Sequence, residues 1–154
     1  MPFHKGHNYC VDYAANECEK VYVILFHGCA DEEKILKQHP EWWLSLEERK
    51  KQMMKICENS KDKAEIIPAL IDVSKLRTAD GEEDWDGETP LVRNILGDRL
   101  DAVYSSEPSY GDYFARAYPE AKHRLVDVPR IHYPISGTKI RDMKNEEERE
   151  EWMI

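Results

Sequence analysis

The sequence predicts an α/β protein in which a doubly wound parallel sheet carries helices on both of its faces. Short runs of β-branched and other apolar residues alternate along the chain with segments that have the periodicity of an amphipathic helix. Strands that alternate with helices build parallel βαβ units, and such sheets bind ligands beyond the carboxyl ends of their strands. The 154 residues show neither an internal repeat nor a linker, so we expect residues 1–154 to form one domain.

Each predicted element has its own local signal. The strands are short apolar runs, expected at residues 21–26, 64–73, 101–105 and 124–128. The helices are expected at residues 8–20, 45–60, 90–97 and 110–117, with a last helix from near Ser136 through the glutamate-rich tail. Ser45 and Glu48 have the spacing of a capping box at the start of the second helix. Residues 74–90 are polar and are expected to form a long loop, which in compact domains is often functional.

Composition argues against several classes of protein. The net charge of −9 disfavours nucleic acid as a partner, because binding to a phosphate backbone requires a basic surface. The chain has no apolar run of the length that a membrane-spanning helix needs and no signal-peptide pattern, so we expect no membrane partner. The cysteines form no C-x-x-C pair, and we interpret them as reduced thiols of a cytoplasmic protein: Cys10, Cys18, Cys29 and Cys57.

Two histidines in the motif HKGH (residues 4–7) precede the first predicted helix. This position places two imidazoles and several backbone N–H groups at the positive end of a helix, where a phosphate can bind. A loop of this kind normally follows a buried strand, whereas here only Met1, Pro2 and Phe3 precede it. Taken alone, the pattern is equally compatible with a histidine that caps a turn.

The segment ISGTKIRD (residues 135–142) has the composition of a second phosphate-binding turn. Its polar side chains are those of Ser136, Thr138, Lys139 and Arg141, and Gly137 lets the backbone approach a ligand. Hydroxyl groups, backbone N–H groups and a guanidinium together suit a polyphosphate. Arg130 and His132 add positive potential upstream. Alone, the S-x-T pattern is usually a helix cap, but the occurrence of both motifs in one βαβ domain is more specific.

PFHKGH (residues 2–7) and ISGTKIRD resemble the two signatures of the HxGH nucleotidyltransferase superfamily, the second of which reads approximately ISxTxIR. The chain is most similar to the nicotinamide mononucleotide (NMN) adenylyltransferase domain of bifunctional bacterial proteins that also carry a ribosylnicotinamide kinase. The similar stretches are WDGETPLVRNIL, DAVYSSEPSYGDYFA and LVDVPRIHYPISGTKIR. The resemblance covers nearly the whole chain and implies a Rossmann-like sheet.

By this resemblance the reaction is the transfer of AMP from ATP to NMN, which gives NAD and pyrophosphate. The 5′-phosphate of NMN attacks the α-phosphorus of ATP directly, without a covalent enzyme intermediate. The protein then has to align two anions and neutralise charge on the leaving group. A Mg²⁺ ion that bridges the phosphates is implied, held mostly by the nucleotide and by water, with no metal-ligating residue expected in the chain. A homo-oligomer is compatible with the sequence.

The resemblance also implies roles for individual residues. His7, His4 and Arg141 would be catalytic, with His7 the stronger candidate for stabilising the transition state. ATP would be bound by residues of three segments: His4, Gly6 and His7; Ser106 and Glu107; and Ser136, Gly137, Thr138 and Arg141. Trp85 would stack on the nicotinamide ring and, with Arg130, bind the acceptor. The neighbouring Asp84 and Asp86 could favour the positive charge of that ring.

Several of these residues have a simpler structural interpretation. Trp85 could anchor its loop on the domain, and Glu107 could cap the helix that follows it. Trp42 and Trp43 are expected to pack a loop, with a lid as the alternative. The competing functions are another HxGH enzyme, of the cytidylyltransferase or pantetheine-phosphate type, and an inactive nucleotide-binding module.

The family has a strand before HxGH, and that strand is missing here. In the doubly wound order it lies in the middle of the sheet, so its neighbours would keep unpaired N–H and C=O groups. We expect a chain truncated at its N-terminus, with a strand from another chain or a degenerate protein as alternatives. Truncation at the C-terminus is also compatible, because the bifunctional relatives continue into a kinase. No GxxxxGK[ST] motif occurs, so kinase activity is not expected.

Overall fold

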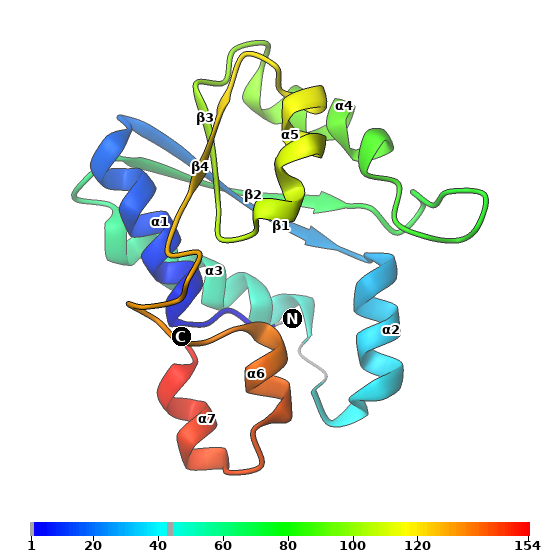
Figure 1. Ribbon diagram of the computed structural model, residues 1–154, viewed down its shortest axis with the longest axis vertical. Coiled ribbons are helices and arrows are strands. Elements are labelled where there is room, and N and C mark those ends of the chain that lie inside the picture. Colours follow the sequence, from blue (N-terminus) through cyan, green and yellow to red (C-terminus); the bar gives the residue numbers. More distant parts are fainter. Residues whose placement is uncertain (1, 43–44) are drawn as a thin grey trace.

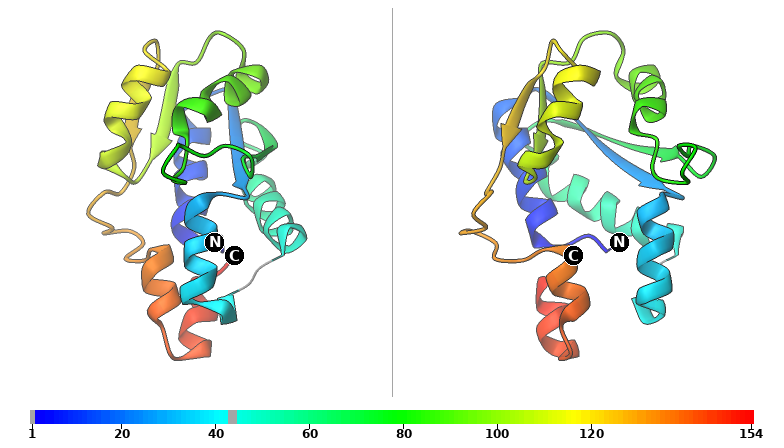
Figure 2. Two further views of the ribbon diagram at one scale, coloured as in Figure 1. Left: turned by 90° about the vertical axis from the view of Figure 1, so that its right-hand side faces the viewer. Right: turned by 45° about the vertical axis from the view of Figure 1, so that its right-hand side comes forward.

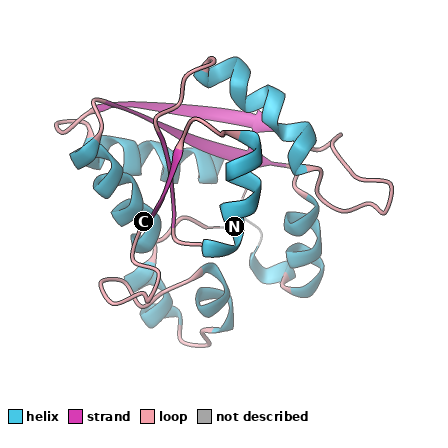
Figure 3. Cartoon of the chain, turned by 45° about the horizontal axis from the view of Figure 1, so that its top comes forward, coloured by secondary structure: helices cyan, strands magenta, loops and turns pink. Residues whose placement is uncertain are grey.

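Parallel strands form two separate two-stranded sheets, rather than the single sheet that the sequence predicted (Figure 1). Strand β1 (Lys20–His27) pairs in parallel with β2 (Glu65–Asp72). Strand β3 (Ala102–Ser105) pairs in parallel with β4 (Lys122–Leu125). The two pairs run in clearly different directions (Figure 3). The mixed α/β class and the parallel pairing are therefore confirmed, and the continuous sheet is not present among the described residues.

The computed structural model describes residues 2–42 and 45–154. Within this part of the chain the α-helices are α1 (Lys5–Glu17), α2 (Ala30–Gln38), α3 (Leu46–Ser60), α4 (Trp85–Leu96), α5 (Gly111–Ala117), α6 (Gly137–Asp142) and α7 (Glu146–Trp152). The short 3-10 helices are η1 (Pro40–Trp42) and η2 (Pro108–Tyr110). None of the described helices combines the length and the apolar character needed to cross a membrane.

Helices cover both faces of the β1–β2 pair (Figure 2). On one face, Val23 of β1 and Met53 of α3 belong to a buried apolar cluster that also packs against α1. On the other face, Ile71 of β2 and Val92 of α4 belong to a second cluster, which α5 joins. Val103 of β3 packs against this second cluster, so the two strand pairs share one apolar layer.

Strands β1 and β3 each keep one unpaired edge. In a parallel ladder, successive residues direct their backbone groups to opposite sides. The odd-numbered residues of β1 bond to β2, so the N–H and C=O groups of Tyr22 and Ile24 point away from it. Ala102 and Tyr104 are placed in the same way on β3, pointing away from β4. No described segment pairs with either edge, which is why the strands remain two sheets.

The outer edge of β2 carries Pro68 in its middle, opposite Val23 of β1. The register directs the nitrogen of Pro68 away from β1, so its missing hydrogen removes no bond from the ladder. A proline at this position also prevents another strand from pairing with the outer edge. The prediction of a strand across this proline is confirmed, with β2 as its observed form.

Most predicted elements are present with small shifts of their ends. The predicted strands 21–26, 64–73 and 101–105 correspond to β1, β2 and β3, and the predicted helices 45–60 and 110–117 correspond to α3 and α5. Helix α1 begins at Lys5 rather than at residue 8, because His4 acts as its N-cap. Strand β4 ends at Leu125 rather than at residue 128, because Asp127 has a positive φ of 48° and belongs to a loop.

The predictions for the helices after β2 need correction. Helix α4 begins at Trp85, not at Pro90, because the Asp84 carboxylate accepts the Gly87 N–H over 2.9 Å as a cap. Pro90 lies inside the helix, where it removes one intrahelical hydrogen bond. The tail does not form one continuous helix with ISGTKIRD: α6 ends, and Asn145 caps the separate α7 by accepting the Glu147 N–H over 3.0 Å.

Helix α2 was not predicted, although Asp31, Glu32 and Glu33 give its first turn the acidic residues that favour a helix start. The four cysteines are free thiols, as predicted. Trp43 and the side chain of Trp42 lie outside the described residues, so the expected packing of this pair stays a prediction.

Candidate functional site

His4 and His7 form a reciprocal cap at the start of α1. The Nδ1 atom of His4 accepts the Gly6 N–H over 3.2 Å, and the Nδ1 atom of His7 accepts the His4 N–H over 3.1 Å. The two rings stack with their centroids 3.9 Å apart. Because both Nδ1 atoms accept hydrogen bonds, a neutral ring carries its proton on Nε2. In each neutral ring the remaining N–H donor is therefore Nε2–H.

Both imidazoles are disposed to remain neutral near pH 7. His4 is only 4% exposed, and burial together with the nearby Arg130 lowers its pKa to about 4. Although the side chain of His7 is partly exposed at the surface, desolvation of the ring, followed by the charges of His4 and Arg130, lowers its pKa to about 3. The site thus offers neutral donors beside one guanidinium.

Gly6 lies where the two sequence motifs approach each other. A Cβ atom at this position would lie 3.0 Å from both Cε1 and Nδ1 of His4 and 3.7 Å from Cγ2 of Ile135. Ile135, the first residue of ISGTKIRD, is fully buried. The first turn of α1 therefore lies next to the segment leading into α6.

The loop that leads to this contact is held by Asp127. Its carboxylate accepts backbone N–H groups of Ile131 over 2.7 Å, of Tyr133 over 3.0 Å and of His132 over 3.2 Å. Arg130, inside the same loop, has a φ of 51°. This uncommon conformation for a residue other than glycine is stabilised by the bonds on either side of it.

Arg130 links the loop to the end of β3. Its Nη1 donates to the carbonyl oxygen of Ile135 and its Nη2 to Oε1 of Glu107, each over 2.7 Å. Glu107 is the N-cap residue of η2, but its side chain makes no capping hydrogen bond. The interpretation of Glu107 as a side-chain cap was therefore wrong. Ser106, which precedes it, is half-buried at the end of β3.

Helix α6 presents the hydroxyl and guanidinium groups of the second motif. Ser136 caps it by accepting the Lys139 N–H over 3.1 Å, and Gly137 is its first residue. Ile140 is fully buried and anchors the helix. On the more accessible side, Arg141 Nη2 donates to Thr138 Oγ1 over 3.1 Å, so these two predicted phosphate contacts lie next to each other.

Trp85 belongs to an aromatic cluster rather than to a loop. Its ring centroid lies 5.0 Å from those of Tyr110 and Tyr113, in edge-to-face geometry with both. The Tyr113 hydroxyl also donates to the Trp85 carbonyl oxygen over 3.0 Å. Trp85 therefore attaches α4 to η2 and α5. The sequence analysis did not identify Tyr110 and Tyr113 as neighbours of Trp85. Their spacing of three residues was the signal that could have indicated it.

The carboxylates near this cluster differ from those that the sequence suggested. Asp84 caps α4, and Asp86 pairs with Arg116 over 2.9 Å. Burial raises the pKa of Tyr110, and the negative charges of Glu107, Asp31 and Glu83 raise it further. These three carboxylates come from η2, α2 and the loop before α4, so negative potential converges on the aromatic cluster from three elements.

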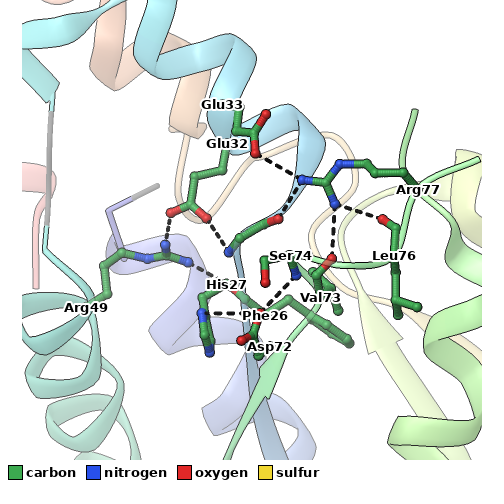
Figure 4. A network of polar contacts seen from close by, with 11 residues as sticks. Phe26, His27, Glu32, Glu33, Arg49, Asp72, Val73, Ser74, Leu76 and Arg77 are labelled. Atoms are coloured by element: carbon green, nitrogen blue, oxygen red, sulfur yellow. Dashed lines mark hydrogen bonds and ion pairs between the residues drawn. The ribbon is translucent and has the colours of Figure 1, made fainter. Parts of the chain in front are cut away.

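A network of arginines and glutamates fixes the turn after β1, at the carboxyl end of the sheet (Figure 4). The Gly28 N–H donates to Oε2 of Glu32, and the Gly28 carbonyl accepts from Nη2 of Arg77, each over 2.8 Å. Arg49 pairs with Glu32 and donates to the carbonyl oxygen of Phe26 over 2.8 Å. Sequence analysis missed this network, because its members come from four separate segments.

No residue other than glycine fits position 28 of this turn. Its φ is 73°, and a Cβ atom would lie 2.7 Å from Cβ of Ser74. The close approach of the two strand ends lets Arg77 reach Gly28, and Arg77 also pairs with Glu33 over 3.1 Å. The network thereby fixes the start of α2, from which the charge of Asp31 acts on Tyr110.

Glu88 is a buried carboxyl group next to the same region. It is 8% exposed, and its Oε1 atom has no hydrogen-bond partner among the described residues. Burial, followed by the charges of Glu83 and Asp84, raises its pKa to about 7. Glu88 lies one turn after Trp85 in α4.

The donor set at the two motifs suits an anion. It consists of imidazole, hydroxyl, guanidinium and backbone N–H groups. Among the described residues, no three His, Cys, Asp or Glu side chains converge in a way that could hold a metal ion.

Two comparisons with known proteins gave no match. No protein-family model matches the chain, and no curated protein matches it at a significant level.

Proposed function

We propose that the chain is a nucleotidyltransferase of the HxGH type that transfers AMP from ATP to NMN, giving NAD and pyrophosphate. The observation that carries the proposal is the close approach of HKGH to the start of ISGTKIRD at Gly6 and Ile135. Two segments from opposite ends of the sequence, each rich in donors for phosphate oxygens, meet at one place. Such a double donor set supports the binding of a polyphosphate.

The chemistry needs positioning and charge stabilisation rather than a nucleophilic side chain. An oxygen of the NMN phosphate forms a bond to the α-phosphorus of ATP. The bond from that phosphorus to the bridging oxygen breaks, and its electron pair leaves with pyrophosphate. The attacking phosphate is largely ionised at neutral pH, so no general base is required. The protein's contribution is to align the two phosphates and to stabilise the charge that develops.

His4 and His7 suit the role of neutral hydrogen-bond donors. Their Nδ1 atoms accept backbone hydrogen bonds, which leaves the proton on Nε2 for a phosphate oxygen. His7, nearer the surface, is assigned to the α-phosphate, where charge changes in the reaction. Thr138 and Arg141, which are joined by a hydrogen bond of 3.1 Å, are assigned to the β- and γ-phosphates with Ser136. Mg²⁺, bound to the nucleotide, would supply further neutralisation of charge on the leaving group.

The acceptor is assigned to the region of Trp85 and Tyr110. Aromatic faces together with the carboxylates of Asp31, Glu83 and Glu107 favour a flat cationic ring, and the nicotinamide ring of NMN carries a positive charge. Nicotinate mononucleotide carries a carboxylate in place of the carboxamide on the ring, and this negative potential disfavours it. Arg130 joins the acceptor region to the histidines, because it pairs with Glu107 and lowers the pKa of both imidazoles.

The finer fold that we propose is a Rossmann-like sheet in which the β1–β2 and β3–β4 pairs are the two halves. The unpaired edges of β1 and β3 are then the positions at which one additional parallel strand would pair. An extended segment there would satisfy the backbone groups of Tyr22 and Ile24 on one side and of Ala102 and Tyr104 on the other.

The direct test is to incubate the chain with ATP, Mg²⁺ and NMN and to measure NAD and pyrophosphate. Equal amounts of both products are expected. Parallel reactions contain nicotinate mononucleotide, phosphopantetheine or glycerol phosphate as acceptor, and CTP in place of ATP. A product formed only from one of these alternatives would assign a different HxGH activity. Failure to bind ATP in a calorimetric titration, together with the absence of every product, would exclude the proposed function.

A charge-matched pair of variants separates the site from the surface. Arg141→Ala is expected to lower kcat by about a hundredfold or more, the usual loss for one donor to a transition state. Arg99→Ala removes the same charge from a side chain that is 89% exposed, and it is expected to leave kcat unchanged. Equal effects of the two substitutions on kcat would show that Arg141 is not part of the site.

A further inference from the structure

The end of the chain lies against the start of α1, so that the two termini are close together (Figures 1 and 2). Met153 pairs with His4 in an antiparallel backbone bridge. The preceding residue, Trp152, has its ring under the ammonium group of Lys5, with Nζ 5.9 Å from the ring centroid. Both contacts involve residues of HKGH, namely His4 and Lys5. They join the last residues of α7 to the first phosphate motif.

Trp152 also faces the second motif. Its ring lines an open depression of about 400 Å³ together with Pro134, Lys139, Asp142, Met143 and Glu148. Lys139 and Asp142 belong to ISGTKIRD, and Pro134 directly precedes it. One side chain near the end of the chain therefore adjoins both motifs.

We propose that Trp152 is a positioning residue that holds Lys5 of HKGH in place relative to α6. This inference rests on the proposed function. Helices α6 and α7 are short, and short helices are not stable on their own in water, so tertiary contacts must fix them. Ile140 anchors α6 from the inside. On the outside, Trp152 lies between Lys5 of α1 and the depression that Lys139 and Asp142 of α6 also line.

An aromatic ring suits this task better than the other side chains of α7. The helix is rich in glutamate, and Glu146, Glu147, Glu148, Glu150 and Glu151 are all exposed. A carboxylate in contact with Lys5 would neutralise its charge and repel a polyphosphate. A ring attracts the ammonium group through its π-face and adds no negative charge. Lys5 is thus held while its charge remains available to the ligand.

The test is a double-mutant cycle between Trp152 and Lys5, read out as the dissociation constant for ATP with Mg²⁺ by calorimetry. Trp152→Ala is expected to weaken ATP binding about two- to fivefold, the range for one exposed cation–π contact. Trp152→Phe keeps an aromatic face and is expected to bind ATP within about twofold of the wild type. In a Lys5→Met background, Trp152→Ala should have no further effect. Glu151→Ala, a neighbouring exposed position, serves as the control.

The outcomes separate this inference from the proposed function. If the wild type binds ATP, and the effects of Trp152→Ala and Lys5→Met are additive, the positioning role is wrong and the proposed function stands. Loss of affinity in Trp152→Phe equal to that in Trp152→Ala also overturns it, because the π-face would not be the relevant feature. If the wild type binds no ATP, both proposals fail. Coupling between the two positions, with rescue by phenylalanine, supports the positioning role.

Discussion

Arg130 and Glu107 are joined by a hydrogen bond of 2.7 Å between Nη2 and Oε1, and this pair connects two regions that are separate in the sequence. On one side, Arg130 also donates to the carbonyl oxygen of Ile135 at the start of ISGTKIRD. On the other side, Glu107 contributes to the negative potential around Tyr110. The pair is therefore the physical link between the proposed phosphate and acceptor regions.

Arg130→Ala is expected to weaken ATP binding about fivefold, which corresponds to roughly 1 kcal/mol for a partly exposed charged hydrogen bond. The reason is that Ile135 loses the donor that fixes its carbonyl, so the turn into α6 is less well placed. The measurement is calorimetric titration with ATP and Mg²⁺. Arg116→Ala is the control, because Arg116 pairs with Asp86 at the surface. Similar affinities in the two variants would argue against the linking role of Arg130.

His7→Ala is expected to reduce NAD formation by about a hundredfold through kcat, because a donor to the transition state is removed. The loss of its cap to the His4 N–H should reduce the free energy of unfolding by about 1 kcal/mol, so the fold is retained. Steady-state kinetics and thermal unfolding measure these two effects. His39→Ala, at the C-terminal end of α2 and outside both motifs, should leave kcat near the wild-type value. A wild-type turnover in His7→Ala would contradict the assignment.

Gly6→Ala is expected to impair ATP binding and activity, because the new Cβ would lie 3.0 Å from two ring atoms of His4. The ring has to move, and the hydrogen bond from the Gly6 N–H to Nδ1 is then weakened. Gly111→Ala is a matched control in a helical position, where the nearest atom would lie 3.6 Å away. That substitution should be neutral or stabilise the protein by up to about 1 kcal/mol. Equal tolerance at both glycines would show that His4 does not depend on Gly6.

The raised pKa of Glu88 predicts that the free energy of unfolding depends on pH. Its pKa is raised to about 7 from 4.5 in the folded state, so the folded protein binds this proton more tightly than the unfolded chain. The contribution of Glu88 to the free energy of unfolding is therefore complete below pH 4.5 and is lost as the pH rises through 7. Melting temperatures of the wild type and Glu88→Gln between these limits measure the effect.

The Glu88→Gln variant should show a weaker decrease in melting temperature with rising pH than the wild type. Glu147→Gln, at an exposed position on α7, should follow the wild-type curve. His4 changes stability in the opposite sense, since its pKa is lowered to about 4 and its contribution is lost as the pH falls below 6.5. Parallel curves for the wild type and Glu88→Gln would show that Glu88 does not titrate in this range.

An additional N-terminal strand is expected to stabilise the chain. The variant carries an extension of about ten residues, the length of a strand and its lead-in, with a continuous β-branched run. Pairing with β1 and β3 would satisfy their unpaired backbone groups and raise both the melting temperature and the rate of NAD formation. The control extension has the same length, with prolines at two positions of the run, so that it cannot pair. Equal stability and activity of the two extended chains would exclude the proposed strand position.

The sequence predicted β1, β2 and β3 because each is a short apolar run, and Pro68 was compatible with β2 since it faces an outer edge. It misplaced β4, whose residues Lys122–Leu125 are mostly polar. It also indicated that HKGH and ISGTKIRD would lie together, and Gly6 and Ile135 are neighbours in the structure. The pairing of Arg130 with Glu107 could not be predicted, because it depends on the positive φ of Arg130. The separation of the strands into two sheets depends on hydrogen bonding between distant segments, which local patterns do not reveal.

Pro68 has a consequence for how the chain can associate with copies of itself. Fibrils grow when every added strand offers a fresh edge to the next one. A strand that docked on β2 would have to pair with an edge whose central residue has no N–H to donate, so growth through β2 is terminated at its first step. Any assembly built through strand pairing would therefore have to use the other edges of these sheets.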